Sequence, residues 1–159
     1  MASIKTMKRD VKEFDATEFF NQTPENVEAG KKEIFVIRKY TVLERGQINL
    51  IMAEDATPER REKAVQRCAD IRIKAESITD PAEREKLLDS ATPEQQIEIS
   101  AQAIKKLEMH TLLSCVDSAP FDEGWNEEVI DYIEKINHPL YDKLLEVIRE
   151  FNRPPARGN

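Results

Sequence analysis

The chain has 159 residues, of which 35% are charged and 40% are apolar, and its formal net charge is −7. This length and apolar content suit one domain with a real core. Four glycines and 6% aromatic residues argue against a β-sandwich or barrel, and the negative charge argues against a dedicated nucleic-acid binder. No window approaches the roughly 18 apolar residues that span a bilayer, and no signal peptide begins the chain, so we predict a soluble, cytoplasmic protein without a membrane partner.

The first 40 residues yield one clear element. Residues 32–40 predict a strand, because Ile34, Phe35 and Val36 continue into further β-branched and aromatic residues. One strand cannot stand alone, so its partner comes from residues 1–30 or from another subunit. For residues 1–31 themselves, an amphipathic turn, a short strand and a loosely ordered arm all stay open.

Helix starts recur along the next fifty residues. Thr41 and Glu44 form a capping box, which predicts that a helix follows the strand directly. Thr57 and Asp80, each followed by proline, predict two further helix starts. The pattern therefore turns from one strand to a run of helices.

Residues 93–116 are interpreted as the central helix of the protein. Its first half is amphipathic, whereas its second half, which includes Leu112 and Leu113, leaves almost no polar face. A helix that is apolar all round is covered on all sides, by other helices or by a partner subunit. We therefore predict that both leucines are buried.

The C-terminal part predicts a loop and two helices. Residues 117–125 form the loop, and its Trp125 is either an anchor to the core or a binding hot spot. Asn126 caps one helix, and Pro139 begins the last one. The whole reading is a mainly α fold of about six helices with a small β element near the N-terminus. We expect one domain over residues 1–152 and a disordered tail over residues 153–159.

No motif in the sequence indicates a reaction. The two histidines and two cysteines lack the close spacing of a zinc site, and no phosphate-binding or nucleophile motif occurs. The best candidates for catalysis are His110 or the carboxylate pairs around Trp125, which are Asp122 with Glu123 and Glu127 with Glu128. The apolar neighbours of His110 favour a core or interface histidine, and loop solvation with favourable charge at a helix N-terminus accounts for the carboxylates. A pocket in which His110 meets Glu108 and Asp117 would favour an enzyme. We expect neither an enzyme nor a cofactor or metal.

Two short segments carry a family resemblance. The strand IFVIR at residues 34–38, followed by TVLER at residues 41–45 opening a helix, resembles the tail assembly chaperones of long-tailed bacteriophages. The closing helix LLEVIREFN at residues 144–152 is similar to the end of that family. The resemblance implies a self-associating, non-enzymatic protein of the host cytoplasm that coats the tape-measure protein before the tail tube forms. It also implies that a longer, frameshifted form of the chain exists.

The resemblance leads to a prediction of partner-binding residues. A tape-measure protein is long and helical, so its chaperone needs apolar surfaces that receive amphipathic helices. The alternative function is a structural phage protein of the neck or connector, which stays in the particle. Apolar residues of the strand, the loop and the last helix are the predicted contacts with the tape-measure protein or a second copy: Val36, Phe121, Trp125, Leu144, Ile148 and Phe151.

Overall fold

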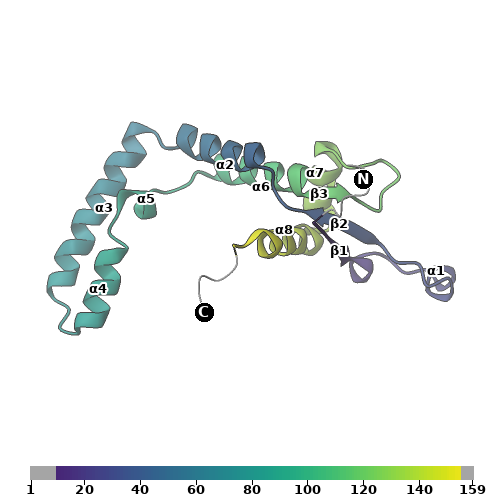
Figure 1. Ribbon diagram of the computed structural model, residues 1–159, viewed down its shortest axis with the longest axis horizontal. Coiled ribbons are helices and arrows are strands. Elements are labelled where there is room, and N and C mark those ends of the chain that lie inside the picture. The colour runs from purple at the N-terminus through teal and green to yellow at the C-terminus, as the bar shows by residue number, and fades with distance from the viewer. Residues whose placement is uncertain (1–9, 155–159) are drawn as a thin grey trace, which may run out of the picture. The chain divides into compact units, whose positions relative to one another are not determined.

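The computed structural model describes residues 10–154, which form eight α-helices, one 3-10 helix and three strands (Figure 1). The predicted mainly α fold with a small β element near the N-terminus is confirmed. In chain order the elements are β1 (Val11–Asp15), η2 (Thr17–Phe19), α1 (Pro24–Glu28), β2 (Ile34–Arg38), α2 (Val42–Asp55), α3 (Pro58–Glu76), α4 (Pro81–Asp89), α5 (Pro93–Gln96), α6 (Ala101–Cys115), β3 (Val116–Ser118), α7 (Glu127–Ile136) and α8 (His138–Asn152).

The chain forms two compact units. Unit 1 combines Met1–Gln47 with Leu107–Asn159, and unit 2 is Ile48–Lys106. Both boundaries fall inside helices, one in α2 and one in α6. Residues 1–9 and 155–159 lie outside the described part of the chain, and with them most of the predicted tail.

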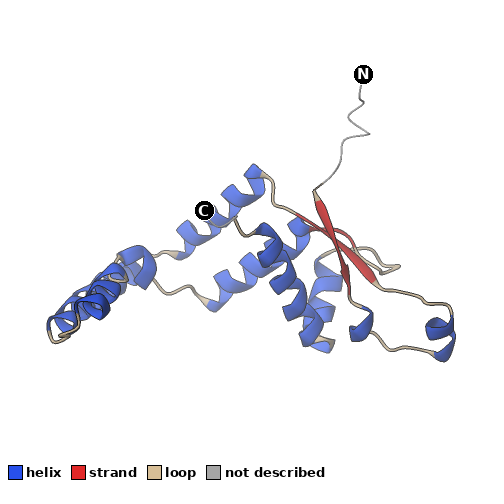
Figure 2. Cartoon of the chain, turned by 60° about the horizontal axis from the view of Figure 1, so that its bottom comes forward, coloured by secondary structure: helices blue, strands red, loops and turns tan. Residues whose placement is uncertain are grey.

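The sheet of unit 1 is antiparallel, with the order β1-β2-β3 (Figure 2). The predicted strand β2 is therefore the central one. Phe14 of β1 lies opposite Phe35, and Val116 of β3 lies opposite Ile37. Of the two sources considered for its partner, residues 1–30 provide one neighbour, β1, and β3 pairs with the other edge, so both edges of β2 are paired within the chain.

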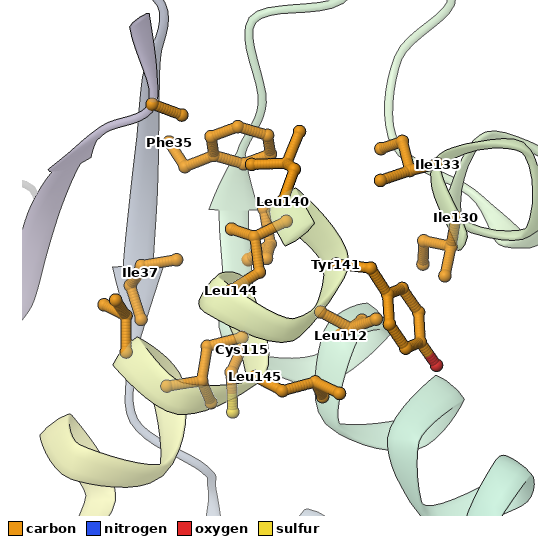
Figure 3. Packing of buried hydrophobic residues seen from close by; sticks show 14 residues of the cluster. Phe35, Ile37, Leu112, Cys115, Ile130, Ile133, Leu140, Tyr141, Leu144 and Leu145 are labelled. Carbon is orange, nitrogen blue, oxygen red and sulfur yellow. The ribbon is translucent and has the colours of Figure 1, made fainter. Parts of the chain in front are cut away.

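The core of unit 1 lies between the sheet and the helices α6, α7 and α8. Phe35 and Ile37 alternate with half-buried residues along β2, as one covered face of a strand requires. Figure 3 shows their side chains among those of α8. The largest fully buried side chains of this core are Phe35, Ile37, Leu112, Cys115, Ile130, Leu140, Leu144 and Ile148.

The junction of β2 and α2 is held by the predicted capping box. Thr41 N donates to Glu44 Oε1 at 2.8 Å, and Glu44 N donates to Thr41 Oγ1 at 3.2 Å. Glu44 also accepts two hydrogen bonds from the Arg38 guanidinium, at 2.8 and 2.7 Å. One carboxylate thus fixes both the end of the strand and the start of the helix.

Unit 2 has a core of small side chains. Its helix α3 packs against α4 and α5. The buried apolar residues of the unit are Ile51, Ala64, Cys68, Ala75, Ala91 and Ala103, and only Ile51 among them is large. Such a core removes little apolar surface from water, so unit 2 has little hydrophobic stabilisation to draw on.

Residues 93–116 do not form the single helix predicted for them. The helix α5 ends at Gln96, and Ile97 has an extended backbone with a ψ of 129°. Ser100 then begins α6 as a cap, because its hydroxyl accepts from Ala103 N at 3.0 Å. Ser100 N also donates to the Asp55 carboxylate at 2.8 Å. The cap by the Ser100 hydroxyl is a local alternative to helical hydrogen bonding, and the bond to Asp55 adds a long-range one, so both compete with continuation of the helix.

Candidate functional site

Unit 1 carries an open groove with a volume of about 680 Å³. One wall consists of Phe19, Phe20 and Asn21, which follow β1. The other wall is α7, and Phe121 from the preceding loop joins the two. The groove is mostly apolar and lies on the surface, which makes it the candidate functional site of the protein.

The helix α7 has a second apolar face, and that face lines the groove. Ile130 and Ile133 belong to the buried core. Tyr132 and Ile136 line the groove and are 62% and 63% exposed. Two large apolar side chains, one helical turn apart and open to solvent in a shared groove, are typical of a surface that another molecule covers.

The aromatic part of the groove is rigidly supported. The Phe121 ring lies 5.7 Å from that of Phe20 and 5.8 Å from that of Phe35. It also stacks on Trp125, whose Nε1 donates to the Leu112 carbonyl at 2.8 Å. Trp125 therefore anchors the loop and stands behind Phe121, so the wall is held in place before any ligand arrives.

Asn137 connects the two walls of the groove. Its Nδ2 donates to the Phe19 carbonyl at 2.8 Å. Its Oδ1 accepts from Leu140 N at 3.3 Å and caps α8. The same side chain thus ties the segment after β1 to the junction of α7 and α8, and it sets the width of the groove at that end.

The charged residues that line the groove, within the range that the structure describes, are all acidic. They are Glu123 in the loop and Glu128 in the first turn of α7. The surrounding sequence shares this bias, since residues 107–134 contain no Lys or Arg. The carboxylates of that stretch are Glu108, Asp117, Asp122, Glu123, Glu127, Glu128, Asp131 and Glu134.

The six predicted contact residues do not gather at one surface. Phe121 lines the groove, and Trp125 supports it from behind. Leu144 and Ile148 are 1% and 0% exposed in the core, where a partner cannot touch them. The remaining two, Val36 on the outer face of β2 and Phe151 near the end of α8, are half-buried away from the groove.

Sequence reasoning missed Tyr132 and Ile136, the two exposed large apolar residues of the groove. The available signal is a second apolar row on α7, in which Val129, Tyr132 and Ile136 follow at spacings of three and four residues. The first row of Val129, Ile130 and Ile133 accounts for the buried face, and the extra row marks an uncovered one.

The candidate catalytic side chains have structural partners instead. His110 Nε2 lies 2.7 Å from the Glu44 carbonyl, and its ring stacks on Tyr40. Glu108 accepts from the Tyr141 hydroxyl at 2.7 Å, and burial together with this bond raises the pKa of Tyr141, which stays a neutral donor. Asp117 lies in β3. Neither of the two described cavities is lined by these residues.

The second cavity, in unit 2, has a volume of about 190 Å³ and is polar. Its arginines are already engaged. Arg67 donates to the Gln96 carbonyl at 2.7 Å and pairs with Glu98 at 2.8 Å. Arg60 donates to the Glu98 carbonyl at 3.2 Å. These bonds fasten α3 to the segment after α5, so we assign the cavity a structural role.

Across residues 10–154, no three His, Cys, Asp or Glu side chains are placed to hold a metal ion. No helix within the described range is long and apolar enough to cross a bilayer. No family model, curated protein or solved structure matches the chain.

Proposed function

We propose that this protein is a tail assembly chaperone that binds the tape-measure protein of a long-tailed phage, in the groove of unit 1. The observation that carries the proposal is the exposed apolar row of Tyr132 and Ile136 opposite Phe19 and Phe20. An amphipathic helix inserts side chains at positions i, i+3 and i+4 into a groove of this kind. A long helical protein with repeated apolar stripes supplies many such segments.

Weak binding at each groove is sufficient for this function. Many copies along one tape-measure chain act together, because each bound copy shields part of the same extended molecule. Self-association of the chaperone, its longer frameshifted form and its place in the host cytoplasm belong to the proposal as predictions. The short sequence matches at residues 34–38, 41–45 and 144–152 are its other support.

The test is co-expression with a tape-measure protein, followed by purification through a tag on that protein. We expect wild-type chain to co-purify and keep the tape-measure protein soluble. Ile136→Glu should abolish both effects, because it puts a charge in the groove. Ile73→Glu in α3 is the matched control, since Ile73 is 66% exposed and Ile136 is 63% exposed.

Two outcomes would contradict the proposal. If both variants lost binding equally, the groove would not be the binding site for the tape-measure protein. If the tape-measure protein stayed soluble when expressed without this chain, it would need no chaperone. The neck or connector hypothesis would then lead if the chain were present in purified particles, where an assembly chaperone is absent.

A further inference from the structure

We infer that the groove of unit 1 selects an amphipathic helix with a Lys or Arg at one end of its apolar row. This inference rests on the proposed function and names the chemistry of the segment that binds. The inference depends on where charged and apolar side chains follow each other along α7. The presence of an apolar groove does not by itself specify that order.

The groove changes character along α7. Glu128, Tyr132 and Ile136 are spaced by four residues, so they form one row on the same side of the helix. Successive members are about 6 Å apart along the axis. The row therefore begins with a carboxylate and continues with two exposed apolar side chains.

Among residues 10–154, no cation lies at the acidic end of the groove. Glu123 lies at the same end, in the loop before α7, and both carboxylates are exposed. Within residues 10–154 neither Glu123 nor Glu128 forms an ion pair. The described part of the chain contributes no basic residue to the groove lining. A partner with a cation at this end gains attraction, and one with a carboxylate there is repelled.

These features define the partner's sequence pattern. Two apolar residues at a spacing of three or four meet Tyr132 and Ile136, and a Lys or Arg about one turn beyond them meets Glu128 and Glu123. A helix with the same apolar row and a Glu at that position is disfavoured. The groove thereby distinguishes between amphipathic segments of similar hydrophobicity.

The experiment uses two labelled synthetic helices with one apolar row and either Lys or Glu at its end. Fluorescence anisotropy with the full chain gives Kd at 50 and 300 mM NaCl. We expect the Lys peptide to bind about tenfold more tightly at low salt and the difference to shrink at high salt. Glu128→Lys should reverse the preference. Glu127→Lys is the matched control, since Glu127 is exposed in the same turn but does not line the groove.

Equal affinities for the two peptides, no binding of either, or an unchanged preference in Glu128→Lys would overturn the inference. Binding that appears only after removal of residues 1–9, which contain Lys5, Lys8 and Arg9, would assign the groove to the chain's own N-terminal segment instead.

Circular dichroism of each variant verifies that it is folded. If the protein prefers the Lys peptide but does not bind the tape-measure protein, the proposed function alone is contradicted. If it binds the tape-measure protein but shows no preference between the peptides, the inference alone is contradicted.

Discussion

Leu112 and Leu113 are neighbours in α6 with opposite surroundings. Leu112 is fully buried in the core of unit 1, whereas Leu113 is 38% exposed. Because consecutive residues of a helix point about 100° apart, one of the two faces the core and the other faces solvent. The prediction that both leucines are buried is therefore wrong for Leu113, because the apolar pattern of α6 extends beyond its buried face.

We expect Leu112→Ala to lower the free energy of unfolding by about 2–5 kcal/mol, since it leaves a cavity in a packed core. Leu113→Ala should cost less than about 1 kcal/mol, because much of that side chain is already in water. Urea denaturation followed by circular dichroism measures both. Similar losses in the two variants would mean that Leu113 is covered in solution, most simply by a second copy.

Glu44 links stability to pH through a single carboxyl group. The hydrogen bonds from Arg38, followed by those of the capping box, lower the pKa of Glu44 to about 2. The unfolded chain has an ordinary pKa near 4.5 at this position. Because the folded value is the lower one, the ionised carboxylate stabilises the fold fully above about pH 4.5, and this contribution is lost as the pH falls towards 2.

Glu44→Gln should therefore be less stable than wild type by about 1–2 kcal/mol at pH 7, with the difference shrinking between pH 4.5 and pH 2.5. The range allows for solvent screening, since 22% of the side chain is exposed. Denaturation curves over this pH range measure the effect. Glu146→Gln, which breaks an exposed pair with Lys143, is the control and should change little. A pH-independent difference would contradict the assignment to Glu44.

At the scale of elements, β2 organises unit 1 because it has a neighbour on each side and α8 over one face. Phe35→Ala should cost about 3–5 kcal/mol. Val36→Ala on the opposite, half-buried face should cost about 1 kcal/mol. Thermal and urea unfolding compare the two variants. Equal costs would mean that a partner covers the outer face of the sheet.

The sequence predicts elements well where local chemistry is strong. The reciprocal bonds of Thr41 and Glu44, and the caps at Thr57 and Asp80, are present as expected. The sequence left a short strand open as one of three alternatives for the segment that forms β1, and it did not predict β3. The pairing of both strands depends on distant residues: Val11 lies opposite Arg38, and Val116 opposite Ile37. The break before α6 was missed for the same reason, since Asp55 is far from Ser100 in sequence.

The site was predicted less well than the fold. A helical row such as Leu144 and Ile148 looks the same in sequence whether it faces a core or a partner, and here it faces the core. Phe121 was predicted because it lies in the same loop as Trp125, a residue type enriched in binding hot spots. Tyr132 and Ile136 became significant only when Phe19 and Phe20, more than a hundred residues earlier, were placed across from them.

For the whole molecule, the two units differ in what they bury. All of the largest fully buried side chains belong to unit 1. The helix α4 in unit 2 has no buried residue. We expect unit 2 to open locally at a lower free energy than unit 1. Hydrogen–deuterium exchange with mass spectrometry should show faster exchange in peptides from α3 and α4 than in those from α8. Equal protection would contradict this expectation.

The division of unit 1 between two stretches of sequence has a consequence during synthesis. The ribosome delivers β2 early, but β3 and the helices that cover Phe35 follow only after all of unit 2. At about 5–20 residues per second, the nascent strand waits roughly 4–16 s for the start of β3 and roughly 6–23 s for the end of α8. Throughout that interval its apolar side chains are available to other nascent chains. Because of this order of synthesis, we expect the protein to be most prone to aggregation on crowded polysomes, before unit 1 and its groove are complete.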